Sequence, residues 1–235
     1  IEPQDRLRPR PLPVSRREID QPVRVEFSAR DRRRGDRALD LRLDEGKPPV
    51  RQGDRGLSVK GPEPGNASYY YSLTRMPARG TVRAGGVPYD VTGTAWMDRE
   101  WGTSALGPGL AGWDWFALQL DDGRELTYYR LRRTDGAADP LSRGSIVAPD
   151  GASRPLGAAD VLAEARGTWP SPRTGARYPA GWRLAVPSAD LDVTLAPVLA
   201  DQELAATVAY WEGAVDVRGT VSGRGYVEMT GYATR

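Results

Sequence analysis

The stretch from Thr94 to Ser104, TAWMDREWGTS, holds two acids and an arginine between two tryptophans. On a β-strand, Trp96, Asp98 and Glu100 would share one face, and Arg99 would point to the other. A buried carboxyl with a like charge beside it stays protonated near neutral pH and can donate a proton. On a solvent-facing strand the same acids only solubilise the chain, and an ion pair with an arginine is a third interpretation. The stretch therefore predicts an acid site, a solvated face or a structural ion pair.

The chain contains no histidine and no cysteine. This excludes Ser-His-Asp and Cys-His nucleophiles, imidazole or thiolate zinc sites, disulfides and CxxC redox pairs within the chain. An acid or base must come from a carboxylate, Tyr, Lys or Arg, and a metal would need oxygen ligands. Because the acids lack the spacing of a calcium-binding loop, we expect the chain to hold its shape without a metal.

Charge and hydropathy exclude further classes of function. The 235 residues include 33 basic and 31 acidic ones, so the net charge of +2 provides no strong field for nucleic acid. The Arg-rich residues 30–37 include two aspartates, which favours a solvated loop over a phosphate site. No apolar run reaches the roughly 20 residues of a membrane-spanning helix. Because the chain begins with Ile1, we expect an upstream segment to have been removed, and both the bacterial cytoplasm and export to the periplasm or envelope stay open.

The glycines of residues 107–112, GPGLAG, match the dinucleotide-binding pattern GxGxxG only formally. That pattern needs a helix directly after the glycines, whose N-terminus holds the pyrophosphate. Here the alternating aromatic sequence WDWFALQL follows, which is typical of a strand. We therefore interpret residues 107–112 as a loop between strands.

The elements that must position these residues are β-strands almost throughout. Residues 1–22 are rich in proline and predict an extended arm, and only residues 158–166 have a helical pattern. Asp122 and Gly123 predict a tight hairpin turn with positive φ values. The short strands are separated by Gly, Pro, Asp and Asn, as in a sandwich or barrel. The predicted strands are residues 23–29, 38–44, 56–60, 68–76, 80–84, 89–97, 113–120, 125–133, 144–149, 182–187, 191–198, 209–219 and 225–232.

Six long motifs occur in a characteristic order: GNASYYYS, GTAWMDREWG, GWDWFALQLDDGRELTYYRLR, YPAGWRL, YWEGAV and GRGYVEMTGY. With these motifs, residues 38–235 resemble the lipocalin-like superfamily of bacterial carotenoid 1,2-hydratases and AttH-type predicted secreted hydrolases. Fungal lipocalin-like Diels–Alderases are more distantly similar. Two departures stand out, because the family's N-terminal Glu-Trp-Trp-Tyr signature is missing and Arg99 stands where many members have histidine.

The resemblance implies an all-β fold of two successive lipocalin-like antiparallel β-barrels with an apolar pocket. Residues 1–105 would form the extended arm and the remaining strands of a first, incomplete barrel, and residues 106–235 would form the second. Open strand edges in an incomplete barrel would need cover. We therefore expect a separate N-terminal fragment or chain as one partner and an apolar small molecule as the ligand. We expect neither a nucleic-acid partner nor a membrane span.

The resemblance also implies a cofactor-free enzyme, a hydratase (lyase) or a cyclase like the Diels–Alderases, that acts on a polyene, isoprenoid or polyketide. Asp98 or Glu100 would be the acid, and we expect at least one of them to be buried against Trp101, Trp113 or Trp115. In a cyclase, Arg99 or a tyrosine would polarise a carbonyl. A non-catalytic protein that binds an apolar ligand and a purely structural module stay open as alternatives. For Trp211 and Tyr232 we favour a place in the core that closes the barrel. The residues expected to line the pocket are Trp96, Trp101, Trp113, Trp115, Tyr70, Trp211, Glu212, Tyr226 and Glu228.

Overall fold

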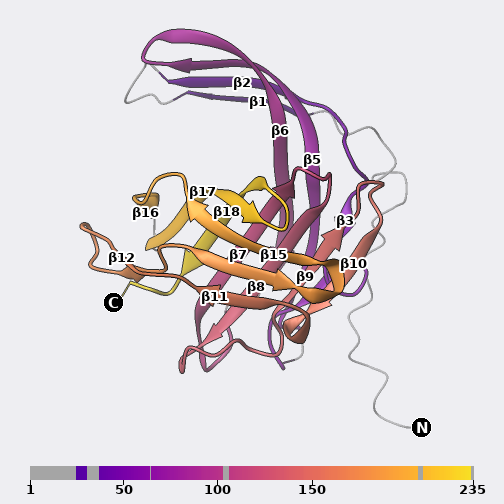
Figure 1. The fold of residues 1–235 in the computed structure, drawn as a ribbon, viewed down its shortest axis with the longest axis vertical. Helices are drawn as coiled ribbons and strands as arrows, with labels where there is room; N and C mark the ends of the chain where they lie inside the picture. Colours follow the sequence, from indigo (N-terminus) through magenta and orange to yellow (C-terminus); the bar gives the residue numbers. More distant parts are fainter. Residues whose placement is uncertain (1–24, 31–36, 64, 103–105, 206–208, 234–235) are drawn as a thin grey trace. The chain divides into compact units, whose positions relative to one another are not determined.

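The computed structural model describes residues 25–30, 37–63, 65–102, 106–205 and 209–233 (Figure 1). The arm predicted over residues 1–22 lies outside the described residues, as does most of the Arg-rich loop. The all-β prediction is confirmed, since the helical segments among the described residues are the 3-10 turns η2 (Ala158–Asp160) and η3 (Pro187–Ala189). The chain forms two compact units, residues 1–50 with 71–100 (unit 1) and residues 51–70 with 101–235 (unit 2). The boundary predicted at residues 105 and 106 stays a prediction.

The strands of unit 1 belong to a six-stranded sheet in which β5 is central. Its order is β1-β2-β5-β3, with β4 and β6 also paired to β5. Two predicted strands, residues 68–76 and 80–84, are one continuous strand in the structure, and a two-glycine turn with φ of 58° and 79° joins β5 to β6. A separate fragment or chain that completes a first barrel stays a prediction. The strands are β1 (Val25–Arg30), β2 (Ala38–Leu43), β3 (Val50–Arg51), β4 (Leu57–Val59), β5 (Ala67–Ala84) and β6 (Val87–Gly102).

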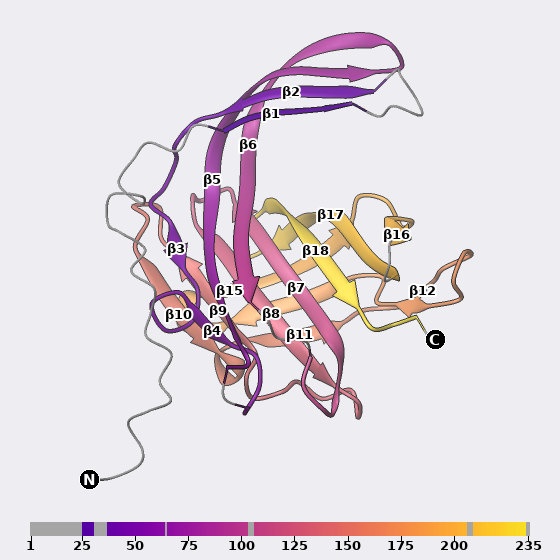
Figure 2. The ribbon, with the colours of Figure 1, turned by 180° about the vertical axis from the view of Figure 1, so that it is seen from behind.

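Unit 2 contains a strongly curled ten-stranded sheet of order β10-β9-β8-β7-β18-β17-β15-β14-β11, with β16 paired to β17 (Figure 2). The pairings among the described residues leave this path open between β10 and β11, so the sheet is a half-barrel, and two closed barrels are not shown. A short second sheet pairs β12 with β13. The strands are β7 (Leu110–Leu120), β8 (Glu125–Arg133), β9 (Arg143–Val147), β10 (Ser153–Gly157), β11 (Leu162–Ala165), β12 (Trp169–Pro170), β13 (Arg177–Tyr178), β14 (Trp182–Val186), β15 (Leu191–Pro197), β16 (Glu203–Ala205), β17 (Ala209–Gly219) and β18 (Gly223–Thr230).

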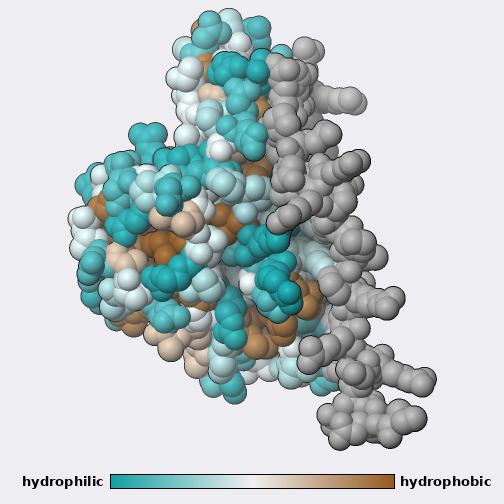
Figure 3. All heavy atoms as spheres, turned by 90° about the vertical axis from the view of Figure 1, so that its right-hand side faces the viewer, coloured by the Kyte–Doolittle hydropathy of each residue, from teal (hydrophilic) through white to brown (hydrophobic). Residues whose placement is uncertain are grey.

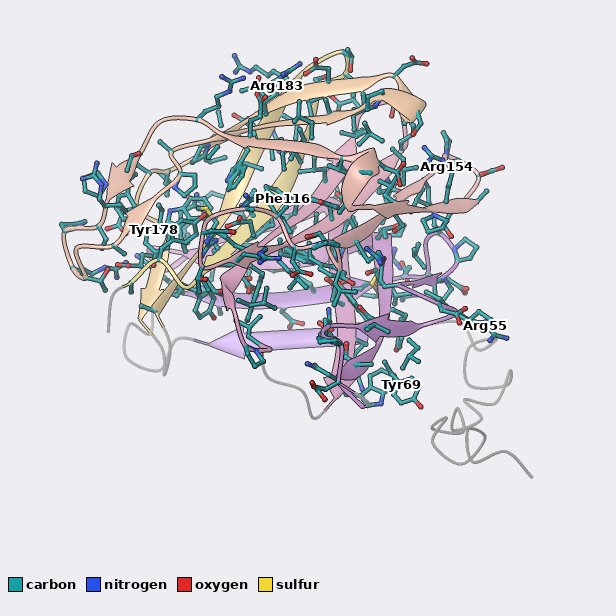
Figure 4. The ribbon with its side chains drawn as sticks, turned by 90° about the horizontal axis from the view of Figure 1, so that it is seen from below. Arg55, Tyr69, Phe116, Arg154, Tyr178 and Arg183 are labelled. Carbon is teal, nitrogen blue, oxygen red and sulfur yellow. The ribbon has the colours of Figure 1, made fainter. Side chains whose placement is uncertain are left out.

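The two faces of the curled sheet differ because side chains alternate along each strand. On β7, the fully buried Phe116 and Leu118 point inward to the core, whereas Trp113 and Trp115 point outward and are half-buried. Figure 4 shows Phe116 among the side chains that fill unit 2. The inner face thus forms the hydrophobic core, and the outer face is the one available for other roles.

The prediction of a helix over residues 158–166 is wrong. The Asp160 carboxylate accepts a 2.7 Å hydrogen bond from the backbone N–H of Gly157 and closes the single turn η2. The chain then extends, and Leu162–Ala165 pairs with Trp182–Ala185 of β14. Pairing with an existing strand overrides the helical propensity of this short segment.

The predicted hairpin between β7 and β8 is present, but its turn differs from the expected one. Only Gly123 has a positive φ, of 84°, whereas a primed turn of type I′ needs two such residues. The Asp122 carboxylate instead accepts a 3.0 Å hydrogen bond from the backbone N–H of Arg124. A local side-chain bond therefore supports the turn.

Glu203 on β16 is a buried carboxylate that fastens the loop between β12 and β13. The hydroxyls of Ser171, Thr174 and Tyr178 donate hydrogen bonds to it over 2.5, 2.6 and 3.0 Å. Burial by itself raises the pKa of Glu203, but these hydrogen bonds and the Arg173 guanidinium outweigh it and hold the pKa below its ordinary value. The ionised form therefore stabilises the fold.

We expect Glu203→Gln to lower the free energy of unfolding at pH 7 by on the order of 2 kcal/mol, because buried hydroxyl donors lose a charged acceptor. The contribution is present above the unfolded pKa, near ~4.3, and disappears as the pH falls through the lower folded value. Urea unfolding at a series of pH values should thus show the two chains converging below about pH 4. A pH-independent difference would contradict this assignment.

On the face that Figure 3 shows, hydrophilic side chains predominate and apolar ones are scattered among them. Single exposed apolar residues of this kind are normal on protein surfaces. Within the described ranges, no helix has both the length and the apolar composition of a membrane span.

Candidate functional site: two tryptophan–carboxylate pairs

The acidic stretch of β6 places Trp96 and Asp98 on one face, as predicted. The Trp96 indole N–H donates a 2.9 Å hydrogen bond to Asp98 Oδ1, and both side chains are half-buried. The prediction that at least one of Asp98 and Glu100 is buried is wrong, since Asp98 is only half-buried and Glu100 is exposed. Arg99 is exposed as well. The reason lies in the alternation: Ala95 and Met97 pack against the small core of unit 1, so Asp98 is on the opposite face.

A second tryptophan–carboxylate pair lies on the outer face of unit 2. The Trp113 indole N–H donates a 2.7 Å hydrogen bond to Glu228 Oε1. Glu228 is registered with Trp115 on one side and with Glu212 on the other, so these four side chains share a face. All four are half-buried. Four predicted site residues from three strands thus gather in one place.

Two tyrosines extend this outer face. Tyr226 is 51% exposed on β18, next to Glu228 in the alternation. Tyr70, which is 3% exposed, accepts a 3.1 Å hydrogen bond from the Trp115 indole N–H. We call the set Trp113, Trp115, Glu212, Tyr226 and Glu228 the aromatic acidic face.

Two further predicted site residues, Trp211 and Trp101, lie outside both this face and the Trp96–Asp98 pair. Trp211 is 2% exposed in the core of unit 2, where its indole N–H donates a 2.9 Å bond to the Ala200 carbonyl. This confirms the interpretation of Trp211 as core. Trp101 is 45% exposed and stacks on Tyr69 with ring centroids 5.8 Å apart.

The sequence interpretation missed a buried charge cluster on the inner side of the sheet. Asp114, which is fully buried, accepts hydrogen bonds from Arg130 at 2.9 Å, from Arg132 at 2.8 Å and from the Tyr232 hydroxyl at 2.8 Å. Burial and the Asp114 charge raise the pKa of Tyr232. An acid on β7 and two arginines at alternate positions of β8 were the available signal, but only the strand register brings them together.

The aromatic acidic face can stabilise positive charge and move protons. Indole and phenol rings attract cations to their faces. The indole N–H holds the carboxyl group of Glu228 in a defined orientation beside those rings, as a proton donor or acceptor requires. In unit 1, the Trp96 indole N–H holds the carboxylate of Asp98 by the same kind of hydrogen bond.

The comparisons with known proteins agree with this all-β architecture. The AttH-like family model matches residues 14–232. This chain belongs to the AttH-like family. A crystal structure from Nitrosomonas europaea, of a protein assigned to AttH, is 36% identical with a TM-score of 0.80, over 89% of this chain and 66% of that one.

The crystal structure of kievitone hydratase from Nectria haematococca is similar in fold, at 20% identity and a TM-score of 0.68. The match covers 91% of this AttH-like chain and 65% of the hydratase. The chain therefore spans about two thirds of the length of both solved proteins. Among curated proteins, none matches the sequence.

Proposed function

We propose that this AttH-like chain is a cofactor-free enzyme that hydrates, or cyclises, a hydrophobic polyene, isoprenoid or polyketide. The observation on which the proposal rests is the aromatic acidic face, where the Trp113 indole holds the Glu228 carboxyl group next to Trp115. The likeness in fold to a hydratase supports hydration as the reaction class.

In the proposed hydration, a carboxyl group transfers its proton to one carbon of an alkene, and a tertiary carbocation forms at the other carbon. The aromatic rings stabilise that cation. A water oxygen then forms the new C–O bond, and a water proton returns to the carboxylate, so the enzyme is regenerated. In the cyclisation alternative, the rings mainly hold the polyene in a reactive conformation.

The two tryptophan-held carboxyl groups are the proposed acids. Glu228 and Asp98 are each fixed by an indole N–H, while Glu100 is exposed to solvent. A fixed orientation is the property that separates a catalytic acid from a solubilising one. We therefore rank Glu228 and Asp98 ahead of Glu100, and we assign Arg99 no proton-transfer step.

We expect Glu228→Gln or Asp98→Asn, or both, to lower turnover by about 10²–10⁴-fold, because an amide keeps the shape but cannot deliver the proton. The substrates to try are kievitone and an acyclic carotene, in water labelled with heavy oxygen. Mass spectrometry would detect uptake of the labelled water. Thermal melts of both variants should stay close to that of the native chain.

The matched control is Asp216→Asn on β17. Asp216 is also a half-buried acid, but it belongs to neither tryptophan–carboxylate pair, so this variant should leave turnover unchanged. If the native chain converts a substrate and both Glu228→Gln and Asp98→Asn convert it equally fast, the assignment of the acid is wrong.

A non-catalytic protein that binds an apolar ligand is the second candidate, because Tyr226, which is 51% exposed on the same face as two tryptophans, suits binding as well as chemistry. Mass spectrometry of material extracted from the purified protein separates the two. A bound apolar molecule that is never converted favours binding alone.

A further inference from the structure

Gln52 and Ser58 contact the outer face of unit 2 through polar groups. The Ser145 hydroxyl donates a 3.2 Å hydrogen bond to Gln52, and the hydroxyls of Ser58 and Tyr129 are bonded over 2.9 Å. Gln52, Ser58, Ser145 and Tyr129 are all at most 4% exposed. These hydrogen bonds offset the cost of burying the four polar side chains, so polar contacts and not apolar packing hold this part of unit 2 together.

Lys60 brings a positive charge to this polar region. Its Nζ atom lies 4.1 Å from the ring centroid of Tyr129 and 5.4 Å from that of Tyr70. Such cation–π contacts hold the half-buried ammonium group in place. Lys47 and Lys60 are the two lysines among 33 basic residues. The ammonium group of lysine is a compact charge with three donors, whereas the planar guanidinium of arginine matches two acceptor atoms at once. Lysine at this position therefore suits a single acceptor atom.

Thr127 is the second sign of a ligand. Its side chain is fully buried, and its hydroxyl has no hydrogen-bond partner among the described residues. It lies two residues from Tyr129 on the same face of β8 and is registered with Ser145 of β9. A buried hydroxyl without a partner is destabilising, because it has lost its hydrogen bonds to water and gained none in the protein. An oxygen atom of a ligand would satisfy it.

We propose that Lys60, Tyr129 and Thr127 bind an acidic oxygen, a carboxylate or phenolate, at one end of the apolar substrate. This rests on the proposed function, because the alkene of the same molecule would lie at the aromatic acidic face. Glu228, Trp115 and Tyr129 are in register on three adjacent strands. Strands are spaced about 4.8 Å apart, so the acid and the anchor are separated by roughly 10 Å. The substrate class is therefore an isoprenoid or polyene acid or phenol.

Retinoate and retinol are suitable probes, since both are polyenes and differ in the oxygen group at one end. Quenching of tryptophan fluorescence would measure their binding to the full chain. We expect the native chain to bind retinoate at least tenfold more tightly than retinol. Lys60→Met should abolish this preference by weakening the binding of retinoate at least tenfold, whereas the matched control Lys47→Met should keep the preference.

A second measurement avoids any folding defect of the variants. Acylation of the native chain with acetic anhydride, read by mass spectrometry, should show that retinoate protects Lys60 and leaves Lys47 reactive. Equal binding of the two probes, binding of neither, or no protection of Lys60 would overturn the proposal. Because binding is measured without turnover, a failure to hydrate any substrate leaves this result intact and counts only against the proposed function.

Discussion

Asp114→Asn is expected to lower the free energy of unfolding by about 3–5 kcal/mol, because it removes the only carboxylate bonded to Arg130 and Arg132 within this cluster. Asp114 has no exposed surface, and the two arginine side chains are 15% and 10% exposed. Two buried guanidinium groups would thus lose their counter-charge. Urea unfolding of the native and variant chains measures the difference.

The control for Asp114→Asn is Asp192→Asn on β15. Asp192 also accepts two hydrogen bonds from an arginine, Arg183, at 2.9 and 2.7 Å. This pair is accessible to solvent, and Figure 4 shows Arg183 at the periphery of unit 2. Solvent screens an exposed pair, so we expect a far smaller loss. Equal losses for the two variants would show that burial of the cluster does not determine its contribution.

Trp211→Ala should lower the free energy of unfolding by about 3–5 kcal/mol, because it leaves a large cavity in the core of unit 2. The neighbouring core residues lie on facing strands and cannot all collapse into the space. Trp211→Phe keeps an aromatic ring but loses the N–H bond to the Ala200 carbonyl, so its loss should be smaller. Urea unfolding measures the stability of both variants, and the affinity of the folded fraction for retinoate and retinol is measured beside it.

The same experiment separates a core residue from a site residue. As a core residue, Trp211 should affect stability while the folded fraction keeps its affinity for retinoate and retinol. A native-like melt combined with lost binding would place Trp211 in the ligand site and contradict the core interpretation.

Local patterns in the sequence were enough to predict the longer strands and the faces that their side chains share, but not the short strands β3, β10, β11, β12, β13 and β16. Every predicted strand overlaps a strand of the structure. The alternation of Trp96 and Asp98 predicted the pair that the structure joins by a hydrogen bond. The absence of histidine and cysteine excluded whole classes of chemistry before any fold was known. Each of these inferences depends only on residue type and on spacing within a few positions.

Only the tertiary structure decided the contacts between distant strands. The bond from Trp113 to Glu228 spans 115 positions, and the cluster around Asp114 depends on the register of β7 with β8. Pairing with β14 also turned Leu162–Ala165 into a strand, and the contacts of Ala95 and Met97 with the core of unit 1 left Asp98 on the opposite face. The alternation of side chains is a local property of a strand. The register between strands and the burial of their faces depend on which distant segments pair. The sequence by itself thus determined the longer strands and the available chemistry, and the long-range pairing determined the short strands, which side chains meet and how deeply they are buried.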